Sequence, residues 1–450
     1  MSTAAVSIAP TPSDNTAPLR VHHLTTTLRG GAGGAAQRIF NAQREAGLEV
    51  RGWTGFGGDP APAGWQSLAW RPGPGWRRHR QRLRLSLAKK GRPRSPEPLS
   101  VTDLSGPTPL PSEVTDVDAL HLHWIGGRWL DYPSFVESLP RGLAVVWTLH
   151  DLNAVMPLSH YFDARETEGP GGRAALPSLD HRWFNPLGRG LVARAWEAKQ
   201  ALFARCRVHL VAVAQWQLSV LENSPLGRAA ARTQLIRYPF ALDPDTPPPS
   251  RAQARRRLGL PEDGRYVLLG AANLANPRKG VALAFEALRQ GEVLPGGEPL
   301  GVLTFGAGQP SAGDAARVTQ AFGHVKDPEE LALIYAAADV FVTPALQESC
   351  SQTGLEALAQ GTPVVCFDDT GSTEYTVNGE TGVVAPTRHA GDLSRAITRA
   401  LTDPGLGDQR RVFDAFVASI WGPRFRPDVQ TMRYRDLYES LRAPQAGGAK

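Results

Sequence analysis

The chain has 450 residues, more than one core usually supports, and its hydrophobic content of 42% is ample for two cores. Its three cysteines, Cys206, Cys350 and Cys366, are far apart, which excludes a disulfide framework and favours a reducing compartment. The first residues lack the basic start and the apolar core of a signal peptide, so none is expected, and no stretch is long enough to suggest a membrane span. We therefore expect a two-domain cytoplasmic protein with disordered tails over residues 1–18 and 442–450.

The net charge of +6 comes from one segment rather than from the whole surface. Residues 77–94, inside an insertion spanning 71–113, contain nine Lys or Arg and no acid, so the remainder is slightly negative. The segment fits a solvated insertion, or a patch that contacts an anionic membrane or a lipid-linked acceptor at the inner membrane face. A nucleic-acid partner is not expected, because Trp76 is its only neighbouring aromatic residue and no recognition motif accompanies the charge.

Apolar runs that do not alternate with polar residues predict buried parallel strands, with helices between them. The first strand, 19–24, precedes a glycine-rich loop and a helix over 35–45, and a further helix is expected over 190–204. A proline-rich stretch, 243–261, changes the character of the sequence and marks the domain boundary, after residue 245. The other expected strands lie at 118–125, 143–150, 208–214, 265–274, 301–308, 338–344 and 363–367.

The loop at residues 30–34 holds four glycines between the first strand and the first helix. Glycines permit a close backbone approach to a ligand and positive φ angles. The loop lacks the Gly-Lys-Ser/Thr of a P-loop and the spacing of a dinucleotide fingerprint. It is therefore either a tight turn or a loop that faces a ligand.

Two other strand ends carry candidate catalytic groups. The strand ending at Leu149 delivers His150 and Asp151 to the carboxyl edge of its sheet, where ligands of such sheets bind. Arg278 and Lys279 follow the strand 265–274 and have the charge needed to neutralise a diphosphate. Gly306 ends the next strand, at a bend that we expect near a nucleotide.

The segment from Pro344 to Val365 is the most informative part of the chain. A strand stops at Pro344, Glu348 lies in the following loop, and a helix follows that contains Glu356. Free backbone amides at the start of a helix bind phosphate. The sequence therefore predicts phosphate at the amides of Ser351, Gln352 and Thr353, with both carboxylates beside it to accept hydrogen bonds from sugar hydroxyls.

This run of E-x7-E followed by ALAQGTPVV resembles the donor site of glycosyltransferase family 4, whose members are retaining enzymes with the GT-B fold. The resemblance implies two Rossmann-like domains facing across a cleft, over residues 19–245 and 246–422, and a helix over 423–441 that crosses back to the first domain. It places Glu348 against the transferred sugar and Glu356 on the ribose. It also implies that the reaction requires no metal and no further cofactor.

The resemblance extends to other segments. The TLHD sequence ending at Asp151 and the later HY resemble the colanic-acid (exopolysaccharide) type of the family, which implies that His150 lies near the donor sugar. Gly31, Gly33 and Gly34 would face the donor phosphates, and Val325 would lie by the base. Lys279 is retained. The usual preceding arginine is missing, so we expect Arg278 to replace it, and Cys350-Ser351 stands where the family has Phe-Gly.

The sequence thus predicts a retaining glycosyltransferase that moves a sugar from a UDP- or GDP-sugar to a glycan or lipid-linked acceptor in polysaccharide or cell-envelope biosynthesis. A catalytically degenerate sugar-nucleotide-binding scaffold of a polysaccharide assembly complex is the alternative. A metal-dependent GT-A enzyme is a weaker one, because the D-x-D of Asp116 and Asp118 precedes a strand instead of following one.

Overall fold

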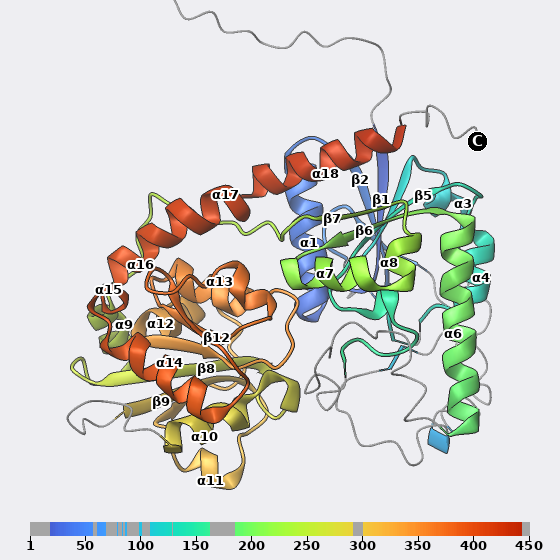
Figure 1. The fold of residues 1–450 in the computed structure, drawn as a ribbon. Helices are drawn as coiled ribbons and strands as arrows, with labels where there is room; N and C mark the ends of the chain where they lie inside the picture. Colours follow the sequence, from blue (N-terminus) through green and yellow to red (C-terminus); the bar gives the residue numbers. More distant parts are fainter. Residues whose placement is uncertain are drawn as a thin grey trace, which may run out of the picture.

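The protein consists of two α/β domains, which the ribbon shows on the right and lower left of Figure 1. Residues 77–94 lie outside the described part except for four positions, so the predictions for this basic segment stay predictions, as do those for the two tails. No helix in the described part is long and apolar enough to cross a membrane. The computed structural model describes residues 19–56, 61–68, 99–100, 109–127, 129–162, 185–290 and 300–442, with His79, Leu83, Ser86 and Leu87.

The N-terminal domain is built on a seven-stranded parallel sheet in the order β3-β2-β1-β4-β5-β6-β7. In register, His23 of β1 is opposite His121 of β4, and Val146 of β5 is opposite His209 of β6. The strands are β1 (Arg20–Thr27), β2 (Glu49–Phe56), β3 (Trp65–Ser67), β4 (Ala119–Leu122), β5 (Ala144–Thr148), β6 (Arg207–Ala212) and β7 (Arg232–Leu235).

Helices cover both faces of this sheet because adjacent strand residues point to opposite sides. Val145 packs with Phe135 and Leu202 on one face, whereas Val146 packs with Ile39 on the other. The helices of this domain are α1 (Gly30–Glu45), α3 (Ser112–Thr115), α4 (Tyr132–Ser138), α6 (Pro186–Arg205), α7 (Gln215–Asn223) and α8 (Pro225–Ala229), with a short turn η1 (Asn153–Val155) after β5.

The C-terminal domain repeats the design with a six-stranded parallel sheet in the order β10-β9-β8-β11-β12-β13. Its strands are β8 (Arg265–Asn273), β9 (Leu300–Ala307), β10 (Gln320–Ala321), β11 (Val340–Thr343), β12 (Val364–Phe367) and β13 (Gly382–Ala385). Its helices and turns are α9 (Arg251–Leu258), η3 (Pro277–Lys279), α10 (Val281–Gln290), α11 (Ala312–Ala315), α12 (Pro328–Ala337), α13 (Gln352–Ala359), η4 (Gly371–Glu374), α14 (Ala390–Thr402), α15 (Pro404–Gly407), α16 (Gln409–Ala415), η5 (Phe416–Trp421) and α17 (Gly422–Arg424).

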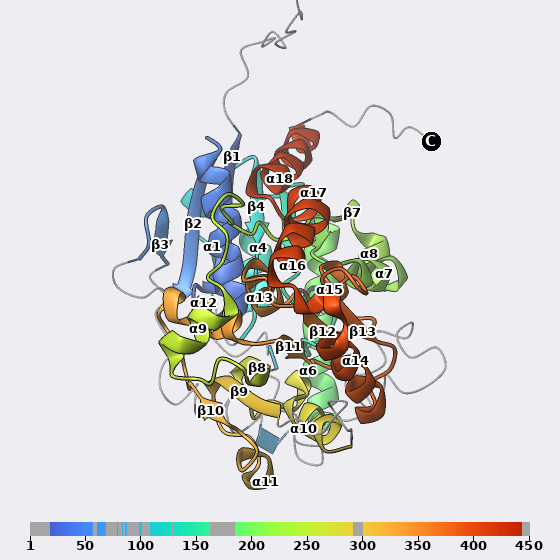
Figure 2. The same ribbon diagram turned by 90° about the vertical axis from the view of Figure 1, so that its left-hand side faces the viewer.

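The last helix, α18 (Pro427–Arg442), crosses from the C-terminal domain back to the N-terminal domain, as Figures 1 and 2 both show. It docks there through tyrosine hydroxyls. The Tyr434 hydroxyl bonds Thr148 at 2.9 Å, and the Tyr438 hydroxyl bonds His121 at 2.7 Å. The fold class predicted from the sequence, including this returning helix, is confirmed.

One local prediction was wrong. The glycines 30–34 do not form a loop before a helix that begins at Ala35, because α1 already begins at Gly30 and they make its first turn. Gly30 has φ +74°, which favours glycine at the junction between strand and helix. The strands β2, β3, β7, β10 and β13 were not predicted from the sequence.

Candidate functional site

The loop after β11 and the start of α13 form the centre of the candidate site. Ser351 stands at the N-cap position in an extended conformation, and its side chain makes no capping hydrogen bond to the helix. Its hydroxyl instead bonds the Thr353 hydroxyl at 2.6 Å. The helix therefore starts where the sequence predicted, with its first-turn amides not capped by Ser351.

Glu348 precedes this helix and is paired with two cations. Lys279 Nζ donates to Glu348 Oε2 at 2.5 Å, and Arg278 Nη1 lies 3.6 Å from the same oxygen. Burial raises the pKa of Glu348, but attraction to Lys279 and Arg278 outweighs burial and leaves that pKa below its ordinary value. The site thus holds an ionised carboxylate that is almost fully buried.

A tight turn brings the two cations to the loop of Glu348. η3 ends at Gly280, which has φ +67°, and a Cβ at this position would lie 1.8 Å from the carbonyl oxygen of Pro344. A residue with a side chain would not fit there. The close approach of the two backbones places Lys279 and Arg278 beside Glu348.

The same loop is fastened to the N-terminal domain on both sides of Glu348. The Gln347 amide exchanges two hydrogen bonds of 2.9 Å with the backbone of Phe162. The Ser349 hydroxyl donates to the carbonyl of His150 at 2.8 Å. The Arg278 guanidinium lies 4.0 Å from the ring centre of Tyr161. The candidate site therefore lies at the interface between the domains.

His150 reaches this interface through its backbone, whereas its ring points into the N-terminal domain. His150 Nδ1 bonds the Tyr238 hydroxyl at 2.8 Å and Nε2 bonds His123 at 3.0 Å. Burial lowers the pKa of His150 to about 4, although Asp151 acts in the opposite direction. The ring is therefore neutral and held by two partners, and its predicted role near the donor sugar stays a prediction.

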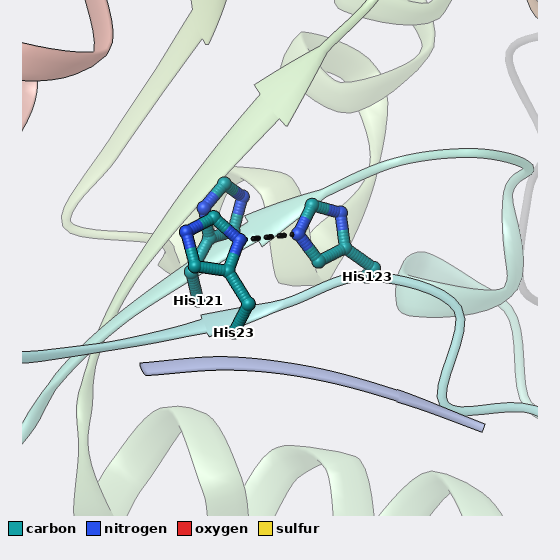
Figure 3. Close-up of side chains that lie close together, drawn as sticks. All are labelled: His23, His121 and His123. Carbon is teal, nitrogen blue, oxygen red and sulfur yellow. Dashed lines mark hydrogen bonds between the residues drawn. The ribbon is translucent and has the colours of Figure 1, made fainter. Parts of the chain in front are cut away.

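His150 ends a hydrogen-bonded row of three histidines, which we call the histidine row: His23, His123 and His150. Figure 3 shows the bond between His23 and His123, which measures 2.9 Å. The row begins at Gln43, whose Oε1 faces His23 Nε2 at 3.1 Å. Because this oxygen only accepts, each ring donates through Nε2 and accepts at Nδ1, and the Tyr238 hydroxyl donates at the far end.

Nitrogens of His23, His121 and His123 lie within 4.8 Å of one another, close enough to hold a metal ion. His121, however, stacks on His123 with ring centres 4.3 Å apart, so the two rings do not aim at a common point. Both of its nitrogens are bonded, to Tyr438 and Thr148. The arrangement fits a network of neutral rings better than a metal site.

Glu356 lies one turn into α13, beside a cavity of about 430 Å³ that the interdomain linker, α12 and α13 enclose. The Tyr335 hydroxyl donates to Glu356 Oε2 at 3.0 Å. From the N-terminal domain, Arg38 Nη2 approaches Glu356 Oε1 to 3.6 Å. A carboxylate at the wall of a cavity suits a ligand with hydroxyl groups.

Residues 315–415 match the family described as Glycosyl transferases group 1. This group 1 segment contains Glu348 and all of α13. Two curated relatives are a D-inositol 3-phosphate glycosyltransferase of Mycobacteroides abscessus (30% identical; 48% of this chain, 49% of the relative) and a 2-deoxystreptamine glucosyltransferase of Streptomyces kanamyceticus (27%; 39% and 47%). The chain thus spans about half the length of these curated relatives.

Solved structures resemble the chain over most of its length. The sucrose-phosphate synthase of Thermosynechococcus elongatus has a TM-score of 0.59 and 19% identity, covering 94% of this chain and 99% of that protein. The Anabaena protein HepE, in complex with UDP-glucose, has a TM-score of 0.57 and 13% identity, covering 94% and 100%. These likenesses establish that the chain has the GT-B fold.

The predicted glycines have different local surroundings. A Cβ on Gly33 would lie 2.4 Å from the backbone of Leu28, whereas Gly31 and Gly34 have open space. Gly306, with φ +122°, packs so tightly that a Cβ would lie 1.8 Å from the carbonyl oxygen of Ala271. Gly33 and Gly306 therefore have a structural reason to be glycine that does not involve a ligand.

Val325 lies before helix α12 and is half-buried against the core of the C-terminal domain. Its predicted place by the base stays a prediction.

The D-x-D pair lies far from the site. Asp118 accepts from the backbone of Arg20 at 2.8 Å and directly precedes β4, at the edge of the sheet opposite its carboxyl ends. Arg38 and Gln347 were not predicted from the sequence, because their partners are distant in the chain.

Proposed function

We propose that the chain is a retaining glycosyltransferase of family 4 that transfers a sugar from a nucleoside-diphosphate sugar. The observation that carries the proposal is the pairing of Glu348 with Lys279 and Arg278 before the N-terminus of α13. The group 1 segment, which includes Glu348 and Glu356, supports it.

In the proposed reaction the bond between the sugar C1 and the diphosphate breaks, and a bond from an acceptor oxygen to C1 forms on the same face. The acceptor proton passes to an oxygen of the leaving diphosphate. Lys279, Arg278 and the amides of Ser351, Gln352 and Thr353 stabilise the charge that develops on the leaving group. No metal is needed for this step, because these groups supply the positive charge.

Glu348 and Glu356 divide the recognition of the donor. Glu348, held ionised by its cations, accepts hydrogen bonds from the hydroxyls of the transferred sugar. Glu356, at the wall of the cavity, accepts from the ribose, and the base extends toward Val325. A UDP- or GDP-sugar is the proposed donor, and a UDP complex of the structural neighbour HepE is consistent with the former.

The proposed acceptor is a glycan or a lipid-linked sugar of polysaccharide or cell-envelope biosynthesis. The resemblance of the segment around His150 to the exopolysaccharide type supports this choice. The basic residues 77–94 would contact an anionic membrane from the cytoplasm. A sugar-nucleotide-binding scaffold without turnover is the alternative function.

Calorimetric titration of UDP, GDP and ADP without added metal tests the donor site. We expect one diphosphate to bind the wild type and to bind Glu356→Ala more weakly. Glu439→Ala, which removes an exposed glutamate of α18, is the matched control and should bind like the wild type. If no diphosphate binds, the proposal is wrong. Binding without transfer or hydrolysis of any sugar nucleotide of that base would instead favour the scaffold.

A further inference from the structure

Arg38 connects the two domains at the place where the proposed donor lies. It projects from α1, donates through Nη1 to Gln352 Oε1, and its Nη2 lies 3.6 Å from Glu356 Oε1. Gln352 and Glu356 are one turn apart in α13 and therefore share a face of that helix. This face is the one expected to meet the diphosphate and the ribose.

Two features show that the contact of Arg38 with Gln352 and Glu356 leaves polar groups available to a ligand. Arg38 and Glu356 are both partly exposed, with 39% and 27% of their side chains accessible, and such ion pairs contribute little because water competes for both charges. In addition, Gln352 Nε2 is buried and has no hydrogen-bond partner among the described residues. A buried donor without a partner favours an acceptor arriving from outside the chain.

A phosphate group satisfies both requirements. Its oxygens accept from the guanidinium through two parallel N–H bonds, which is the geometry that arginine offers and lysine does not. They also accept from the Gln352 amide and from the first-turn amides of α13. Glu356, released from Arg38, is then available for hydroxyl groups while it keeps its bond from Tyr335.

We propose that Arg38 binds the diphosphate of the sugar nucleotide from the N-terminal domain, exchanging Gln352 for phosphate oxygens. The inference rests on the proposed function, because it places the donor at α13. It adds a cation from the first domain to a diphosphate site whose other cations, Lys279 and Arg278, come from the second. Donor binding and the contact between the domains are thereby coupled, since one side chain serves both.

The test compares a nucleoside diphosphate with its own nucleoside. The diphosphate that binds wild type most tightly, among UDP, GDP and ADP, is titrated into Arg38→Ala, together with the matching nucleoside. We expect the diphosphate to bind about tenfold to a hundredfold more weakly, the range of a lost charge-assisted phosphate contact, and the nucleoside to bind unchanged. Arg38→Lys should restore only part of the affinity, because it keeps the charge and loses the fork.

Arg44→Ala is the control from the same helix, since Arg44 donates to the Ala63 carbonyl and not to α13. It should bind both ligands like the wild type. Equal diphosphate affinity in Arg38→Ala and wild type would overturn the inference and leave the proposed function standing. Equal weakening of diphosphate and nucleoside would also overturn it, because Arg38 would then act on the fold or the base. Absence of diphosphate binding to wild type would instead remove the proposed function itself.

Discussion

The two domains meet through one region that buries a charged side chain and another that buries neutral ones. The loop of the C-terminal domain buries Glu348 as a charge, with Lys279 and Arg278 beside it. The histidine row of the N-terminal domain buries rings that have only neutral partners, from Gln43 at one end to Tyr238 at the other. The two regions touch where Ser349 donates to the His150 carbonyl.

The difference shows how partners decide the ionisation of a buried group. Two cations lower the pKa of Glu348 in spite of its burial. Among the described residues the hydrogen-bond partners of the histidine row are neutral, and the attraction of Asp151 does not offset burial at His150. Burial therefore lowers the pKa of His23 to about 3 and that of His150 to about 4. The charged region suits the proposed chemistry, whereas the neutral region suits the docking of α18.

Removing the cation nearest to Glu348 should give the largest effect. Lys279→Ala leaves the carboxylate with the more distant Arg278 and withdraws positive charge from the leaving diphosphate. We expect kcat for transfer or hydrolysis of the donor to fall about 10²–10³-fold, the usual loss when one group that stabilises developing charge is removed. Lys279→Arg, which keeps the charge, should lose much less. A kcat within about threefold of wild type in Lys279→Ala would contradict the role of this pair.

The neutral region should reveal itself through acid sensitivity. A histidine whose pKa is lowered by folding loses stability as pH falls, because the unfolded ring takes up a proton near pH 6.5 and the folded ring does not. For His150, with a folded pKa of about 4, the loss between about pH 7 and about pH 5 is on the order of 2 kcal/mol. Denaturant unfolding of wild type and His150→Gln at both pH values measures it.

His150→Gln should lose less stability than the wild type between about pH 7 and about pH 5. Glu348→Gln provides the contrast from the charged region. Its carboxylate has a lowered pKa, so its contribution is present above the ordinary value of about 4.3 and is lost only as pH falls through the folded pKa. Glu348→Gln should therefore keep the wild-type pH dependence. Identical slopes for wild type and His150→Gln would show that the ring is not held neutral.

The hydrogen bond between Tyr238 and His150, at the end of the histidine row, can be tested separately. Tyr238→Phe removes the hydroxyl that donates to His150 Nδ1 and leaves a buried acceptor unsatisfied. We expect a loss of about 1–3 kcal/mol in the free energy of unfolding. Tyr132→Phe is the control, because the Tyr132 hydroxyl is buried without a hydrogen-bond partner among the described residues, so its removal should cost nothing. Equal losses in both variants would show that the hydrogen bond between Tyr238 and His150 does not contribute to stability.

The features of the candidate site that depend on residues close in the chain could be predicted from the sequence. The start of α13 after Glu348 follows from a strand, a proline and a helix within a short stretch, and the structure has the same order. Lys279 lies on a different loop from Glu348. Because both loops follow the carboxyl ends of strands in one parallel sheet, the sequence placed the two residues at the same edge of the sheet. The prediction of a loop at residues 30–34 was wrong, because a glycine-rich sequence does not distinguish a loop from the first turn of a helix.

Long-range contacts were beyond the sequence. The ring of His150 is fixed by His123 and by Tyr238, which lies in the connection after β7. No local pattern pairs these three residues. Arg38 likewise reads as one polar position of an amphipathic helix, and only the arrangement of the two domains brings its side chain to Gln352 and Glu356. Neutral and charged partners of a buried group are therefore learned from the fold.

Ser349→Ala should have the smallest effect and asks whether the two regions depend on each other. The Ser349 hydroxyl donates to the His150 carbonyl and accepts from Gln217 at 3.1 Å, so its loss frees one side of the loop that carries Glu348. Gln347 still holds the other side through Phe162. We expect about 1 kcal/mol of lost stability and a fall in kcat below tenfold, with unchanged pH dependence of unfolding. A loss of kcat as large as that of Lys279→Ala would mean that the charged pair requires the neutral region to position it, and the separation between the two regions would not hold.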